Sequence, residues 1–118
     1  MNLHTNVEDM AKWSNNFYTY KVGGKKLFNL ISKPGQLNNG QPLTYGFGLE
    51  LKEYKGLHWI GHAGGIAGYN TMFITFPNNN LSITILANLA SISSFNLSFR
   101  IADILLENDV QKENKKNS

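Results

Sequence analysis

Residues 57–76 read LHWIGHAGGIAGYNTMFITF, and this stretch decides the fold. Four glycines and His62 lie between an apolar run, LHWI, and a β-branched and aromatic run, TMFITF. Both flanking runs are typical of strands, whereas glycine weakens a strand unless the backbone turns sharply or approaches another group closely. The stretch therefore predicts two strands joined by a segment whose backbone something approaches, and it raises the question of whether His62 takes part in chemistry there.

The sequence on both sides of this stretch continues the strand pattern. Between Tyr45 and Lys52, apolar side chains alternate with glycine or charged residues, which predicts a strand with one apolar face. Lys55 and Gly56 predict a tight turn into LHWI, and PNNN predicts a hairpin turn before the apolar run at 81–89. We therefore predict an antiparallel meander of about four strands.

Helical spacing precedes the meander. Thr5 stands three residues before Glu8, a capping-box spacing, and the apolar positions that follow predict a helix from about residue 6 to residue 18. A second, shorter helix is predicted over GKKLFNLIS and is ended by Pro34 and Gly35.

Helical spacing returns after Ser91, where an apolar stripe predicts a helix to about Glu107 that packs on the sheet. The sequence thus predicts an α+β domain over residues 1–108, and a disordered, charged tail over 109–118. Because a helix signal falls within the first six residues, we expect the chain to be a fragment of a longer protein.

Composition limits the functional classes. With 118 residues, of which 42% are hydrophobic, the chain suffices for one domain with a modest core. The net charge of +3 comes largely from Lys112, Lys115 and Lys116 in the tail, so no nucleic-acid partner is expected. The absence of cysteine excludes disulfides, thiolate metal sites and a cysteine nucleophile.

Three simple interpretations of the histidines, the glycines and the last helix are disfavoured. On one strand, His58 and His62 would lie about 13 Å apart, too far to share one metal ion, and we expect no metal site. The glycines have the order G-x-x-G-G-x-x-G, which is not that of a phosphate-binding loop, and a strand follows them. The apolar stripe of the last helix is what packing on a sheet requires, so it does not indicate a membrane or partner surface.

Several motifs, in order along the chain, resemble one enzyme superfamily. They are TNVEDMAKW, YGFGLE, the run His62-Ala63-Gly64-Gly65, then Gly68-Tyr69, a strand ending at Pro77, and a strand closing on ILAN. Together they resemble the C-terminal part of the serine β-lactamase and penicillin-binding-protein superfamily, in particular its branch of class C β-lactamases, D-aminopeptidases and esterases. The resemblance covers roughly residues 5–106 and implies the C-terminal part of the β-lactamase/transpeptidase-like fold.

The resemblance implies roles for individual residues. His62, Ala63 and Gly64 match the H-x-G form of the family's third motif, so His62 would supply hydrogen bonding and electrostatics near the nucleophile and the substrate carboxylate. The amide of Gly65 would form half of the oxyanion hole. Ala63, Gly64 and Gly68 would contact substrate, and a side chain at Gly64 or Gly65 would crowd it. The resemblance implies no cofactor.

The chain departs from the family at the decisive point. It contains neither S-x-x-K, which carries the nucleophile, nor Y-x-N, which assists proton transfer, so we expect the isolated chain to be inactive. The parent would act through an acyl-enzyme on a β-lactam, a D-amino-acid peptide or an ester, outside the cytoplasmic membrane, and H-x-G favours the last two substrates. Without the N-terminal strands that the family pairs with its last strand, the 81–89 edge is expected to self-associate.

Two other interpretations stay open. The chain could be a non-catalytic domain that binds peptidoglycan-like peptides or β-lactams beside His62. It could also be an unrelated small α+β domain, in which His62 would be an ordinary packed histidine.

Overall fold

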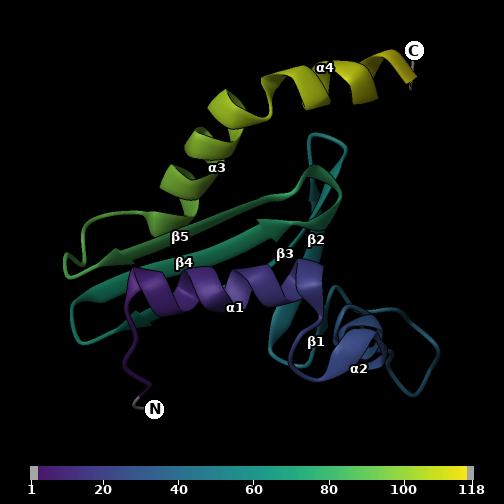
Figure 1. Ribbon diagram of the computed structural model, residues 1–118, viewed down its shortest axis with the longest axis horizontal. Coiled ribbons are helices and arrows are strands. Elements are labelled where there is room, and N and C mark those ends of the chain that lie inside the picture. Colours follow the sequence, from purple (N-terminus) through teal and green to yellow (C-terminus); the bar gives the residue numbers. More distant parts are fainter. Residues whose placement is uncertain (1–2, 117–118) are drawn as a thin grey trace.

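The computed structural model describes residues 3–116 and shows four α-helices, a short 3-10 helix and a five-stranded sheet (Figure 1). The elements are α1 (Val7–Thr19), α2 (Gly24–Ile31), β1 (Tyr45–Gly46), β2 (Leu49–Tyr54), β3 (Leu57–Ile66), β4 (Tyr69–Phe76), η1 (Pro77–Asn79), β5 (Leu81–Ala87), α3 (Ser94–Leu105) and α4 (Glu107–Lys116). The strands lie in chain order, and each is antiparallel to the next. The predicted α+β class is confirmed.

Three of the strand connections are loops of two residues that end in glycine. Phe47-Gly48 joins β1 to β2, Lys55-Gly56 joins β2 to β3, and Ala67-Gly68 joins β3 to β4. Both residues of each loop have positive φ, between 49° and 88°, as type I′ hairpin turns require. Glycine at the second position makes this backbone conformation accessible, and the turns fix the register of the strands they connect.

The first of these loops corrects a detail of the prediction. The alternating stretch from Tyr45 to Lys52 is two strands, because the chain reverses at Phe47 and Gly48. Apolar alternation continues through the turn, so periodicity alone does not reveal the reversal. Phe47 is 68% exposed and therefore does not belong to the apolar face that the alternation suggested.

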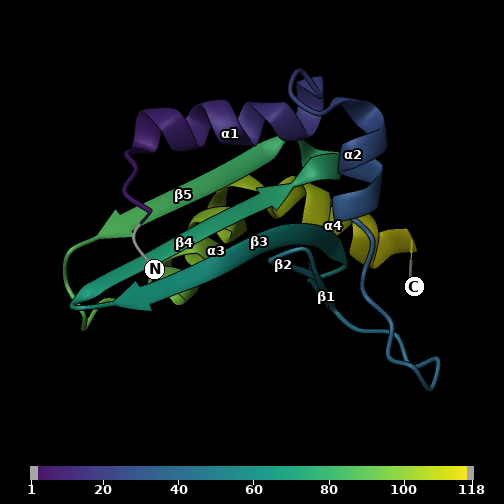
Figure 2. The same cartoon turned by 90° about the horizontal axis from the view of Figure 1, so that it is seen from below.

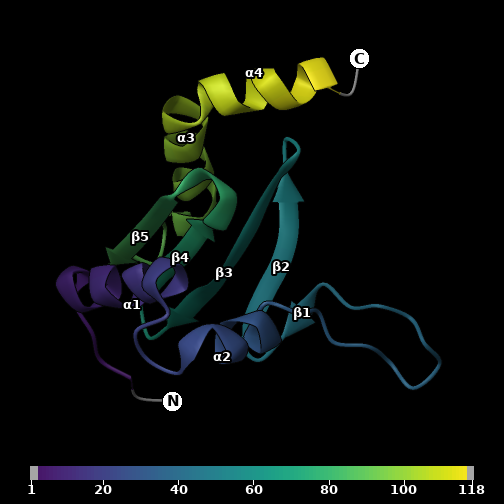
Figure 3. The same cartoon turned by 45° about the vertical axis from the view of Figure 1, so that its right-hand side comes forward.

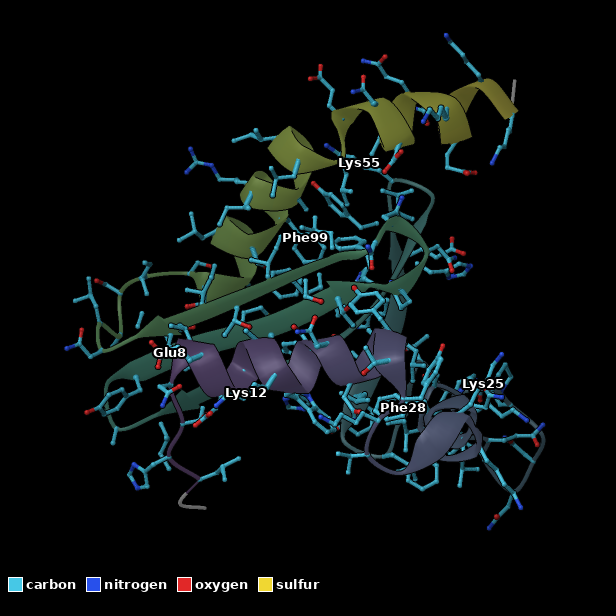
Figure 4. The ribbon with its side chains drawn as sticks, viewed as in Figure 1. Glu8, Lys12, Lys25, Phe28, Lys55 and Phe99 are labelled. Atoms are coloured by element: carbon cyan, nitrogen blue, oxygen red, sulfur yellow. The ribbon has the colours of Figure 1, made fainter. Side chains whose placement is uncertain are left out.

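The core has two parts, one on each face of the sheet. On one face, α3 packs over β4 and β5, and the buried residues there are Leu57, Trp59, Met72, Ile74, Phe76, Ile83, Phe99, Ala102 and Leu106. On the other face, α1 runs alongside β5 and α2 follows it (Figure 2), and the buried residues are Phe17, Phe28, Ile60 and Phe73. Figure 4 shows Phe99 between α3 and the sheet, and Phe28 at α2 on the opposite side.

Helix α1 begins one residue later than the proposed capping box. Asn6 is the N-cap, and its side-chain oxygen accepts a hydrogen bond from the backbone N–H of Asp9 at 2.8 Å. The Thr5 hydroxyl instead contacts the carbonyl of Asn6, so the capping role predicted for Thr5 is wrong. Asparagine and threonine are both good caps, and the choice between adjacent residues depends on where the chain enters the helix.

The C-terminal segment differs from the predicted disordered tail. Helix α4 extends to Lys116, with Glu107 and Asp109 in its first turn and Lys115 in its last, an order that complements the helix dipole. Val110 of α4 is partly buried and packs against the core cluster that includes Phe99 and Leu106. Figure 3 shows the β2–β3 hairpin pointing toward α4. Residues 117–118 of the predicted tail lie outside the described residues.

A polar contact joins the β2–β3 hairpin to α3. The Asp103 carboxylate accepts hydrogen bonds from Lys55 Nζ at 2.6 Å and from the Tyr54 hydroxyl at 3.1 Å. The hydrogen bond from Lys55 lowers the pKa of Asp103, and the same bond raises the pKa of Lys55. Across residues 3–116, none of the helices is both long enough and apolar enough to cross a membrane.

Candidate functional site

One half of β3 has a free edge. Strand β2 pairs with β3 only from Leu57 to Gly61, whereas β4 pairs with β3 as far as Ile66. Residues 62–66, which include the H-x-G motif, therefore extend beyond the end of β2 and border the sheet there (Figure 2). A free strand edge offers unpaired backbone donors and acceptors to another extended chain.

Backbone pairing identifies which groups point outward along this edge. The N–H of Leu51 bonds to the carbonyl of Thr44 on the β1 side, so the adjacent residue Glu50 directs its backbone groups toward β3. Gly61 is opposite Glu50 and therefore faces β2. Because the direction alternates along a strand, Gly65 directs its N–H and C=O to the same side, where β2 has ended.

The β3–β4 hairpin gives the same result independently. Ile66 and Tyr69 flank the two-residue loop and form the hydrogen-bonded pair that closes it. The next pair, Gly65 and Asn70, is then a non-hydrogen-bonded pair, so the backbone groups of Gly65 point away from β4. Two separate alternations thus place the Gly65 amide on the free edge.

His62 lies at this edge and contacts Tyr45. The hydroxyl of Tyr45, on β1, is 3.0 Å from His62 Nε2, and the two rings meet edge to face with their centroids 5.7 Å apart. His62 Nδ1 contacts the carbonyl oxygen of Ala63. Since the backbone of Ala63 points outward like that of Gly65, the imidazole lies along the outer edge and is exposed.

Glycine occupies the four positions of the opening stretch for different physical reasons. A Cβ at Gly61 would collide with the carbonyl oxygen of Phe73, and one at Gly64 would lie 2.5 Å from Thr71 Oγ1. Gly68 has φ of 88° in the hairpin loop. The fold itself requires Gly61, because of the backbone packed against it, and Gly68, because of its positive φ, whereas a side chain at Gly64 would require the Thr71 side chain to move.

Gly65 is the exception among these glycines. The nearest atom to a Cβ built there is the carbonyl oxygen of Tyr69, at 4.0 Å, and φ at Gly65 is not positive. Neither close packing nor turn geometry within residues 3–116 therefore requires glycine at this position. A ligand approaching the free edge would supply a reason.

The structure brings four of the five predicted site residues together and leaves the fifth apart from them. His62, Ala63, Gly64 and Gly65 are consecutive on β3 and share its free half, whereas Gly68 lies in the loop beyond Ile66. Tyr45 was not predicted as a site residue, although it opens the Y-G-x-G segment. Its proximity to His62 depends on the β1–β2 turn, which the sequence pattern did not reveal.

The site offers hydrogen-bond donors, but the described chain does not activate a nucleophile. Among residues 3–116, no serine hydroxyl is hydrogen-bonded to a lysine or a histidine. The same span holds no group of three or more histidine, aspartate or glutamate residues arranged to bind a metal ion. The arrangement can stabilise negative charge on a ligand and orient it along β3.

The chain is similar to known proteins over most of its length. The family model described as Beta-lactamase matches residues 1–104. The chain is 24% identical to a D-aminopeptidase of Gluconobacter oxydans (strain 621H) over 86 residues, or 73% of this chain. It is 26% identical over 82 residues, 70% of this chain, to D-aminopeptidases of Brucella ovis and of Brucella abortus (strain S19). The matched part spans 16% of the length of each of these relatives.

Proposed function

Because this chain belongs to the beta-lactamase family, we propose that it forms one wall of an acyl-transfer site in a serine hydrolase that cleaves D-amino-acid peptides or esters. The observation that carries the proposal is the free half of β3, with the Gly65 amide directed outward beyond the end of β2. The nucleophile and its base would come from a part of the hydrolase outside these 118 residues.

The chemistry assigned to this edge is electrostatic. An extended substrate lying beside residues 62–66 would place its scissile carbonyl near Gly65, where the amide N–H donates to the oxygen that becomes negative during acyl transfer. A second donor would come from the nucleophile's own side of the site. A rigid, preorganised donor of this kind stabilises the transition state more than the ground state.

The proposed role of His62 is hydrogen bonding and charge placement at one end of the edge. Its ring is exposed and contacts Tyr45 and Ala63, so it is not a packed core histidine. Because Nε2 and Nδ1 both have partners within the chain, His62 could not accept a proton from a nucleophile without giving up the Tyr45 contact.

The substrate class rests on the relatives. The relatives reported above are named D-aminopeptidases, and this supports a D-amino-acid peptide over a β-lactam as the substrate. The H-x-G form of the third motif agrees with this choice. The alternative is a domain that binds such peptides without turnover, since the isolated chain carries the edge but no Ser–Lys or Ser–His pair among its described residues.

We expect the isolated 118-residue chain to hydrolyse neither nitrocefin, nor p-nitrophenyl acetate, nor D-alanine p-nitroanilide, because a donor without a nucleophile does not form an acyl-enzyme. The measurement is product release followed by absorbance, compared with buffer and with the His62→Ala variant. Turnover that follows the protein through purification and disappears in His62→Ala would contradict the proposal.

Two further observations separate the hydrolase from the binding domain. In-frame S-x-x-K and Y-x-N motifs upstream of this chain in its gene would support the hydrolase. Their absence, together with binding of a D-alanyl-D-alanine peptide that shifts the Gly65 amide resonance of the isolated chain, would support the binding domain.

We also propose that the outer edge of β5 binds a second strand. The backbone N–H and C=O of Gly65 point away from β4, so those of its partner Asn70 point toward β5. Ala87 lies opposite Asn70, and its backbone groups therefore point back toward β4. Alternation then directs the N–H and C=O of Thr84 outward, away from β4. No strand of residues 3–116 pairs with β5 on that side, although α1 runs alongside β5 and contacts it through Tyr18. In the isolated chain, the available partner is a second copy.

The expected result is that light scattering of the isolated chain gives a mass above that of the 13.2 kDa monomer, and that the mass rises with concentration. Thr84→Pro removes the outward N–H and should shift the mass toward the monomer, because proline cannot donate to a new ladder. Thr84→Val retains the N–H and serves as the control. A stable monomer of the wild-type chain at high concentration would overturn this proposal.

A further inference from the structure

We propose that Tyr45 is the positioning residue of His62, and that it holds the imidazole in the Nδ1–H tautomer against the Ala63 carbonyl. Any effect of this contact on catalysis rests on the proposed function, whereas the contact itself involves only Tyr45, His62 and Ala63 of this chain. The contacts that carry it are Tyr45 Oη to His62 Nε2 at 3.0 Å and His62 Nδ1 to the Ala63 carbonyl oxygen.

The tautomer follows from the partners of the ring. A carbonyl oxygen only accepts hydrogen bonds, so the nitrogen that contacts Ala63 must carry the proton. In the neutral ring, His62 Nε2 is then an acceptor, and its partner must donate. The Tyr45 hydroxyl is both a donor and an acceptor, so it satisfies this requirement. In free histidine the Nε2–H form is the more populated one, and the site therefore selects the minor tautomer.

Tyr45 is itself held in place by its backbone. Its carbonyl accepts a hydrogen bond from the N–H of Gly35 at 2.9 Å, which ties β1 to the loop after α2. A Cβ at the next residue, Gly46, would lie 2.7 Å from the Lys33 carbonyl oxygen, so the two segments pack closely there. The hydroxyl that meets His62 thus projects from a hairpin anchored at both its turn and its outer edge.

This arrangement determines how much of the β3 edge a ligand could use. The Ala63 carbonyl points to the edge but is occupied by the His62 ring, whereas Gly65, two residues further, directs its N–H and C=O to the same side. An extended ligand would therefore pair at Gly65 and stop at the imidazole. Tyr45, through His62, would set the register in which a substrate carbonyl reaches the Gly65 amide.

The test is the tautomer of His62 in the isolated chain, measured by long-range proton–nitrogen NMR at a pH where the ring is neutral. For the wild type we expect a protonated, pyrrole-type Nδ1 and a pyridine-type Nε2. Tyr45→Phe keeps the aromatic ring at position 45 but removes the hydroxyl that donates to Nε2, so the imidazole is no longer held against the Ala63 carbonyl. In this variant we expect the two nitrogen shifts to exchange as the Nε2–H form becomes dominant. Tyr69→Phe is the matched control, because Tyr69 is also exposed on this part of the sheet and its hydroxyl makes no hydrogen bond within residues 3–116.

The assignment is supported if the Nδ1–H form is present in the wild type and in Tyr69→Phe and is lost in Tyr45→Phe, while the backbone resonances of the three proteins remain alike. An Nε2–H form in the wild type overturns it, and this result is available even if Tyr45→Phe does not fold. Retention of the Nδ1–H form in folded Tyr45→Phe also overturns it. None of these readings uses a substrate, so failure of the proposed hydrolase would appear separately, in the turnover and gene-sequence tests.

Discussion

Replacing Gly65 by proline in a hydrolase that contains this chain is expected to lower kcat by about 10²–10³-fold, the usual effect of removing one oxyanion donor. The substitution deletes the N–H that points to the free edge of β3. Proline is tolerated at strand edges whose N–H faces away from the ladder, so the sheet should persist. The measurement is steady-state hydrolysis of a D-alanyl ester or anilide at saturating substrate, with circular dichroism to confirm folding.

Gly65→Ala is the matched control for this prediction. It keeps the N–H, and the added methyl has its nearest neighbour, the Tyr69 carbonyl oxygen, 4.0 Å away. If the methyl crowds the substrate, KM rises while kcat stays within about threefold of wild type, since the donor acts in the transition state. Equal kcat values for the proline and alanine variants would show that the Gly65 amide is not an oxyanion donor.

Truncation of Ile74 to alanine should destabilise the chain by about 2–5 kcal/mol, which is a large part of the stability of a small domain. Ile74 has no exposed surface and lies on β4, in the core cluster between the sheet and α3. Removing its side chain there leaves a cavity, because the surrounding structure relaxes only partially around a truncated core residue. Urea unfolding monitored by the fluorescence of buried Trp59 measures the change.

The same substitution at Ile104 provides the comparison. Ile104 is 77% exposed on α3, so Ile104→Ala should change the free energy of unfolding by less than about 0.5 kcal/mol. Similar losses at Ile74 and Ile104 would mean that the sheet and α3 do not pack as described.

The sequence predicted the elements well where periodicity and capping residues agreed. The first helix was expected over about residues 6–18 and spans Val7–Thr19, and the turn at Lys55-Gly56 is present. The errors occurred where local signals were ambiguous. Alternation continued across the Phe47-Gly48 turn, and the polar composition of 109–116 resembled a tail although its charges and Val110 support a helix.

The candidate site was only partly predictable for a similar reason. The resemblance directed attention to His62 and Gly65, which are only three positions apart in the sequence, whereas Tyr45 lies 17 residues away from His62. Their contact depends on two successive hairpins with defined register, and no short sequence pattern encodes that. The direction of the Gly65 amide likewise follows from where β2 ends, which is a property of strand pairing and not of composition.

The glycine-ended loops between β1 and β4 also have a consequence for how the chain folds. Each strand pairs with its neighbour in sequence, so the sheet consists of short-range contacts and its topology requires no early closure of a long loop. Isolated hairpins form within about 1–10 μs, and a turn with two positive φ angles selects one register from the start. We therefore expect the meander to assemble strand by strand and rapidly, with the free half of β3 present as soon as its hairpin with β4 has closed.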